Sequence, residues 1–142
     1  MSRIITCFAV LGLGAATVAS PTSDPTKYEG TYTIVSGEIE HTPFSSEMST
    51  WSTVTITDKT IVITDKDNKK VFACTFTLDN TSLPQVIAMT STFPRRGQSA
   101  TGIIELDGDT LRICYALPGG HMPTDFDSGD NQHSFVLQRI VQ

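Results

Sequence analysis

The chain has little positive charge, few aromatic side chains and only three cysteines. Its 142 residues include 10 Lys and Arg against 15 Asp and Glu, which gives a net charge of −5. Arg95-Arg96 is a tight basic pair, but the basic residues form no long run. From composition and sequence spacing alone, we expect no electrostatic footprint for nucleic acid or anionic lipid. We therefore expect no nucleic-acid partner and no membrane insertion of the mature chain.

The motifs of common enzyme classes are also missing. The sequence contains no Gly-x-Ser-x-Gly elbow, no phosphate-binding glycine loop and no His-Glu-x-x-His. The acid pairs Glu38/Glu40 and Asp125/Asp127 could act in general acid–base catalysis, but most such pairs are simply solvated. We expect a protein without enzymatic activity or a cofactor, and a hydrolase that uses these carboxylates is the weaker alternative.

The candidates for a metal site are three histidines and two acidic turns, Asp65-Lys66-Asp67-Asn68 and Asp107-Gly108-Asp109. His41, His121 and His133 are far apart in the sequence, whereas metal ligands usually come at close spacing with cysteine or carboxylate partners. The segment Asp107-Gly108-Asp109 lacks the further oxygen ligands of a calcium loop. Gly108 adopts a positive φ at low cost, so this segment is typical of a hairpin turn. We expect no metal site.

The N-terminal residues have the pattern of an export signal. After Arg3, residues 4–19 are an almost unbroken run of apolar and small residues. This run is shorter than the roughly 20 residues that span a bilayer, and small residues end it. We expect a signal peptide over residues 1–20, a linker over 21–27 and one domain over 28–142, in a secreted or periplasmic protein. Loss of the leader removes one basic residue and leaves a net charge of −6.

Two cysteines remain after cleavage, Cys74 and Cys114, and an exported protein can join them in a disulfide. Strand alternation places Cys74 with Phe76 on the core face. In the other strand Ile113 takes the core face, which puts Cys114 on the solvent side with Arg112. We therefore predict two separate thiols.

The chain reads as β-strands throughout the expected domain. No window shows the spacing of an amphipathic helix, and alternating or β-branched runs dominate. Tight connections such as Asp58-Lys59 alternate with longer ones such as 117–132. In an up-and-down meander this pattern closes one end of a barrel and leaves a mouth at the other. We predict an all-β, single antiparallel barrel of eight strands, near residues 30–36, 51–57, 60–64, 70–78, 85–90, 101–106, 110–116 and 133–140.

Four motifs resemble one protein family. The stretches EGTYTIVSGE (29–38), GIIELDGDTLRICYAL (102–117), PTDF (123–126) and FVLQR (135–139) occur in this order. Together they resemble an uncharacterised conserved domain abundant in planctomycetes, which is itself similar to lipocalin-like domains. The resemblance covers residues 28 to about 139 and implies a lipocalin-like barrel, but it implies no activity.

The lipocalin-like resemblance also implies structural roles for three residues. Such barrels close their base with an aromatic side chain of the first strand, covered by an arginine of the last strand. Here Tyr32, two residues after Gly30, stands where the family has tryptophan, and Arg139 lies in the last strand. A guanidinium group over an aromatic ring contributes about 0.5–2 kcal/mol. A solvent-exposed Arg139 is the alternative.

The long connections hold the candidate binding residues. Apolar side chains with a few cationic or polar groups are typical of a pocket for an amphipathic anion. Bulky inward side chains can instead fill an eight-stranded barrel. We expect a monomer that binds a small apolar or amphipathic ligand at its open end, and the alternative is a filled barrel that serves as a protein-interaction module of the cell envelope. The candidate ligand-binding residues are His41, Phe44, Trp51, Arg95, Arg96, His121, Met122 and Phe126.

Overall fold

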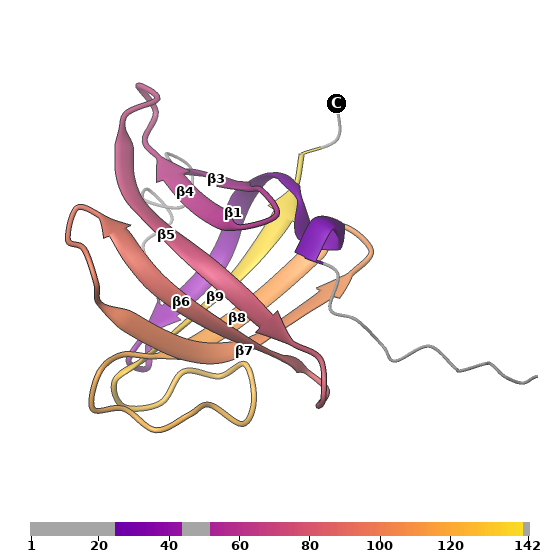
Figure 1. Ribbon diagram of the computed structural model, residues 1–142, viewed down its shortest axis with the longest axis vertical. Coiled ribbons are helices and arrows are strands. Elements are labelled where there is room, and N and C mark those ends of the chain that lie inside the picture. The colour runs from indigo at the N-terminus through magenta and orange to yellow at the C-terminus, as the bar shows by residue number, and fades with distance from the viewer. Residues whose placement is uncertain (1–24, 44–51, 141–142) are drawn as a thin grey trace, which may run out of the picture.

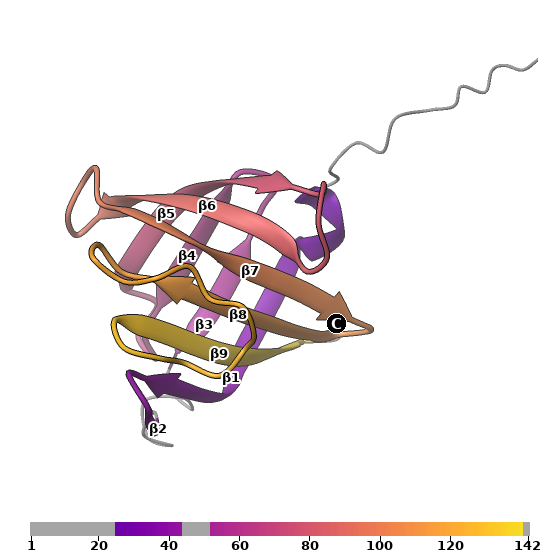
Figure 2. The same cartoon turned by 90° about the horizontal axis from the view of Figure 1, so that it is seen from below.

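The protein folds into a closed antiparallel β-barrel (Figures 1 and 2). The computed structural model describes residues 25–43 and 52–140. A short 3₁₀ helix, Pro25–Tyr28, precedes the sheet. The strands are β1 (Gly30–Ile39), β2 (Thr42–Pro43), β3 (Thr53–Ile56), β4 (Thr60–Thr64), β5 (Lys70–Asp79), β6 (Gln85–Phe93), β7 (Ser99–Asp107), β8 (Thr110–Ala116) and β9 (Gln132–Arg139).

The strand order follows the sequence, as expected for an up-and-down meander. Strands β1 and β3 to β9 pair in succession, and β1 also pairs with β9, which closes the barrel. The predicted eight-stranded barrel is confirmed. The two-residue strand β2 pairs with the end of β1 outside the barrel and was not predicted. Strands β6 and β7 extend beyond their expected ends, so their connection shortens to residues 94–98.

Alternation of side chains builds the core, as the sequence indicates. Inward positions carry large apolar groups, and outward positions carry mostly threonine and charged residues. The two-residue turn at Gly108 and Asp109 joins β7 to β8, with Gly108 at a φ of +62°, so the predicted hairpin is confirmed. The buried core inside the barrel consists of Tyr28, Tyr32, Ile34, Val54, Ile56, Ile61, Cys74, Phe76, Ile87, Met89, Ile104, Leu111, Ile113 and Leu137.

The β3–β4, β5–β6 and β7–β8 turns and the 3₁₀ helix lie at one end of the barrel, which we call the base. Tyr28 of this helix is 1% exposed, and its hydroxyl bonds the side chain of Gln85. Burial raises the pKa of Tyr28 to about 12, with smaller contributions from Tyr32 and Glu105. The 3₁₀ helix therefore packs against the base through Tyr28.

Arg139 joins three residues of the base, Lys27, Tyr32 and Asp109. Its Nη2 donates to the Lys27 carbonyl at 2.7 Å and to the Tyr32 hydroxyl at 2.9 Å, and its Nη1 contacts Asp109 at 3.2 Å. The guanidinium carbon lies 5.4 Å from the centroid of the Tyr32 ring. Gly30 has a φ of +147°, and a Cβ there would lie 3.1 Å from Nε of Arg139. A side chain at this position would therefore strain the backbone and crowd the arginine stem.

The hydroxyl of Tyr32 is central to this arrangement, because it both donates and accepts. It donates to the Tyr28 carbonyl at 2.8 Å and accepts from Arg139. We expect Tyr32→Phe to lower the free energy of unfolding by about 1–3 kcal/mol, since it leaves buried partners unsatisfied. Chemical denaturation measures the change. Tyr115→Phe is the matched control, because the Tyr115 hydroxyl contacts one side chain, His133, at 3.3 Å. Equal losses in the two variants would contradict a special role of Tyr32.

Candidate functional site

The interior of the barrel is almost filled by its own side chains. A cavity of about 70 Å³ remains between core residues that include Ile34, Met89 and Phe135. A water molecule needs a cavity of roughly 10–15 Å³, whereas an apolar cavity of about 150 Å³ accepts benzene. The enclosed space alone is therefore too small for an organic ligand.

A larger pocket opens at the end opposite the base, which we call the mouth pocket. Its volume is about 260 Å³, and its apolar wall includes Phe72, Met89 and Tyr115. These three residues also line the interior cavity, so the two spaces are adjacent. The rest of the wall is formed by Cys74, Ser91, Gln98, Ser99, Ala100, Leu117, Pro118 and His133.

Two neighbouring side chains give the mouth pocket a polar wall. The Tyr115 hydroxyl lies 3.3 Å from Nδ1 of His133, and the two rings meet edge to face at 5.4 Å. Phe135 stacks on Tyr115 with a centroid distance of 6.4 Å. Burial raises the pKa of Tyr115 and lowers the pKa of His133, while the carboxylate of Glu40 opposes the shift of His133. Both shifts favour the neutral form of each side chain, so this wall can bind a polar group without adding charge.

The rim of the mouth pocket carries positive charge. Arg95 lines an adjoining pocket of about 260 Å³ that shares Phe72, Ser91 and Gln98 with the mouth pocket. The Ser91 hydroxyl accepts a hydrogen bond of 3.1 Å from the amide of Gln98, which fixes the β6–β7 turn. An anionic group near Arg95 would therefore lie beside an apolar recess.

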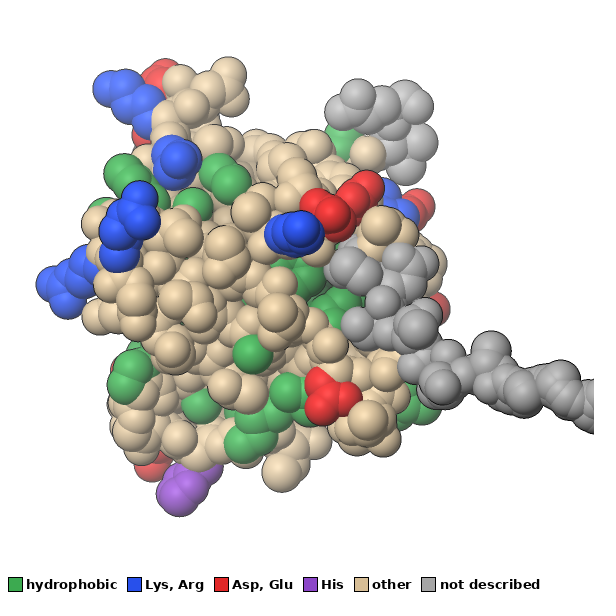
Figure 3. All heavy atoms as spheres, viewed as in Figure 1, with side chains coloured by type: hydrophobic (Ala, Val, Ile, Leu, Met, Phe, Trp, Pro, Cys, Tyr) green, Lys and Arg blue, Asp and Glu red, His purple; other side chains and the backbone are tan. Residues whose placement is uncertain are grey.

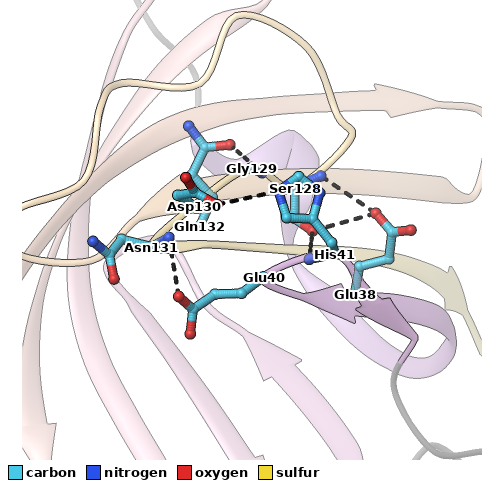
Figure 4. Close-up of polar contacts among 8 residues, drawn as sticks. All are labelled: Glu38, Glu40, His41, Ser128, Gly129, Asp130, Asn131 and Gln132. Atoms are coloured by element: carbon cyan, nitrogen blue, oxygen red, sulfur yellow. Dashed lines mark hydrogen bonds and ion pairs between the residues drawn. The ribbon is translucent and has the colours of Figure 1, made fainter.

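The connection between β8 and β9, residues 117–131, does not project from the mouth. It runs back over the outer side of β8 and β9 (Figure 2), and we call it the strap. Ser128 of the strap is 3% exposed, and both its amide and its hydroxyl donate to Glu38 at 3.3 Å. Its oxygen accepts from the amide of His41 at 3.1 Å, and the His41 ring pairs with Asp130 at 3.3 Å (Figure 4).

Main-chain and amide contacts complete the attachment of the strap. The Glu40 carboxylate accepts from the amide of Asn131 at 3.2 Å (Figure 4). The side chain of Gln132 accepts from the Gly129 amide at 2.7 Å and donates to the His121 carbonyl at 2.8 Å. Both ends of the strap are therefore held by strand residues.

The strap explains an incorrect prediction about Cys114. Alternation does place this residue on the outer face, but it is 0% exposed rather than solvent-facing. Its register partners Ile103 and Ser134 are also buried. The sequence pattern could not show that the strap folds back over this face. Cys74 and Cys114 are both free, so the predicted separate thiols are confirmed.

The candidate binding residues lie in several places. Arg95 and Arg96 lie on the exposed β6–β7 turn, and His41 contacts the strap at the end of β1. His121, Met122 and Phe126 lie in the strap, where Met122 lines an outer pocket with Thr101 and Ala116. Phe44 and Trp51 lie outside the described residues.

Sequence reasoning missed most of the mouth pocket. Its residues Phe72, Met89, Tyr115 and His133 come from four strands. Each was readable as an inward-facing position or as a histidine beside a long connection. Their convergence depends on strand register, which a single sequence does not reveal.

Ser128, His41 and Asp130 have the side-chain types of a hydrolase triad, but their contacts differ from one. The hydroxyl of Ser128 donates to Glu38, and it accepts from the main chain of His41 rather than from the imidazole. A nucleophilic serine instead donates to the imidazole of its general base. The hydrogen bonds and the ion pair of this group fix the strap.

Within residues 25–43 and 52–140, no group of three His, Cys, Asp or Glu side chains is close enough to hold a metal ion. No helix in these ranges is long and apolar enough to cross a membrane.

Comparisons with known proteins found no match: no family model, no curated protein and no solved structure is significantly similar to the chain. The family resemblance therefore stays an interpretation of the four motifs, and the barrel is the part of it that the structure confirms.

Thiol labelling tests how the strap covers Cys114. Burial, with smaller contributions from Asp125, Asp127 and Glu38, raises the pKa of Cys114 to about 11. We expect Glu38→Ala to free Ser128 and to speed alkylation of Cys114 by local opening, as measured by mass spectrometry of peptides. Cys74 serves as the internal reference, because it lies inside the barrel.

Glu29→Ala is the matched control, since Glu29 is an exposed glutamate at the base. It should leave the labelling ratio of the two thiols unchanged. If Glu38→Ala sped both thiols equally, global unfolding rather than strap release would control access.

The half-buried His133 makes stability depend on pH. Because its pKa is lowered in the folded state, the unfolded state binds more protons as the pH falls. Its contribution to stability is therefore full above the ordinary histidine pKa and is lost below it. We expect His133→Gln to reduce the loss of melting temperature between pH 7.5 and about 5. His121→Gln, at an exposed histidine, is the control, and an identical pH profile for His133→Gln and wild type would refute the prediction.

Proposed function

We propose that the protein is an exported, non-enzymatic monomer that binds a small amphipathic molecule in the mouth pocket. The observation that carries the proposal is the apolar recess of about 260 Å³ at the open end, with two neutral polar groups in its wall. Ligand pockets commonly combine a mainly apolar lining with a few convergent polar groups. The proposed lipocalin-like ancestry of the barrel agrees with this use.

The size of the pocket limits the ligand. Pockets for drug-sized molecules usually measure about 300–1,000 Å³. The mouth pocket lies just below this range, and the interior cavity beneath it adds only about 70 Å³. We infer a ligand with a short alkyl chain or a single ring, because a long chain would need Phe72, Met89 or Tyr115 to move.

The charge of the rim favours an anionic head group. Arg95 borders the recess, and the wall formed by Tyr115 and His133 can hydrogen-bond a ligand oxygen. The apolar part would then contact Phe72 and Met89.

An octanoate titration tests this proposal, with octan-1-ol as the neutral analogue. We expect Ala100→Phe to weaken the binding of both probes by about tenfold or more, because the new ring occupies the recess. Ala88→Phe is the matched control, since Ala88 is exposed on β6. Changes in methyl NMR shifts measure binding, and denaturation checks that each variant folds.

The double variant Arg95→Ala/Arg96→Ala should weaken octanoate but not octan-1-ol, and should make octanoate binding less sensitive to salt. No octanoate binding by the wild type would reject the proposal. In that case a filled barrel that serves as a protein-interaction module would be the better interpretation, because the interior is nearly full.

A further inference from the structure

The fold gathers basic residues that the sequence separates. Strands β5 and β6 are neighbours, so the β4–β5 turn (65–69) and the β6–β7 turn (94–98) follow neighbouring strand ends at the mouth. Figure 3 shows several Lys and Arg side chains along its upper left edge, where these turns lie in Figure 1. We call this surface the basic rim, and it consists of the exposed residues Lys66, Lys69, Lys70, Arg95 and Arg96.

The basic rim holds most of the positive charge of the described chain. Five of its nine Lys and Arg residues are there, with only Asp65 and Asp67 among them. Asp65 caps its own turn by accepting from the amides of Asp67 and Lys69 at 2.8 and 3.0 Å. The surface thus has a local excess of three positive charges on a protein that is acidic as a whole.

Exposed apolar side chains lie within this charged surface. Phe93 is 39% exposed, and the ammonium group of Lys70 lies 5.5 Å from the centroid of its ring. Val71, which follows Lys70 in the sequence, is 45% exposed. Cations that surround an aromatic and an aliphatic side chain match the boundary between phosphate head groups and acyl chains, where aromatic rings and basic residues are both favourable.

We propose that the basic rim docks the mouth of the barrel onto a bilayer that contains anionic lipid. The cations contact phosphate groups, and Phe93 and Val71 enter the head-group boundary. A soluble polyanion would use the cations but would gain little from the exposed apolar groups. The acidic strap faces another side of the barrel, so repulsion from the bilayer helps to select this orientation. This docking needs no ligand and is independent of binding in the mouth pocket.

Sedimentation with ligand-free vesicles tests the proposal. We expect the protein to bind vesicles of phosphatidylcholine mixed with phosphatidylglycerol and to dissociate from them at high salt. It should not bind vesicles of pure phosphatidylcholine. Arg96→Glu should weaken binding by about tenfold or more, because it replaces an attraction by a repulsion. Lys59→Glu, which makes the same change of charge at an exposed lysine of the base, should alter binding less than twofold.

A second pair of variants separates a bilayer from a polyanion. Phe93→Ser should weaken vesicle binding but leave retention on heparin unchanged, and Leu83→Ser, at a 90% exposed apolar residue of the base, should affect neither. Circular dichroism verifies that the variants fold. The proposal is overturned if phosphatidylglycerol vesicles do not bind, if Lys59→Glu and Arg96→Glu act equally, or if Phe93→Ser leaves vesicle binding intact. The last result, with retained heparin binding, would identify a polyanion surface instead.

Discussion

The pairing of the first strand with the last is the constraint on which the other features depend. The register that closes the barrel sets Tyr32 of β1 directly opposite Arg139 of β9. The guanidinium group can then reach the Tyr32 ring, the Lys27 carbonyl and Asp109, and so it fixes the 3₁₀ helix beneath the core. Because this end is sealed, the open end is where a ligand can reach the apolar interior.

Closure also determines how much room the interior leaves. In an eight-stranded barrel, large inward side chains nearly fill the lumen, and here about 70 Å³ remains. The filled core stabilises the fold, while Phe72, Met89 and Tyr115 form both the roof of that core and the floor of the mouth pocket. A larger mouth pocket would therefore require a loss of core packing.

Alternation made the strands predictable, since each inward position had to be apolar for the barrel to bury a core. The same alternation correctly placed Cys114 on the outer face but gave it the wrong exposure. The strap that buries it is attached through Ser128 and Glu38, which are 90 residues apart in sequence. Likewise, Lys70 meets Phe93 only because β5 pairs with β6. Such contacts depend on register and on loop paths, which local patterns do not encode.

The attachment of the strap and the basic rim each bring together residues that are far apart in the sequence. They have opposite charge, and they contribute differently to the fold. The carboxylates of Glu38 in β1 and of Glu40 just after β1 hold the strap through Ser128 and Asn131, so this acidic side is committed to internal hydrogen bonds. The basic residues extend from two short turns whose main-chain contacts leave the side chains exposed. Side chains on such turns can change without disturbing the strand ladder. The charge of the rim can therefore vary independently of the base and the strap.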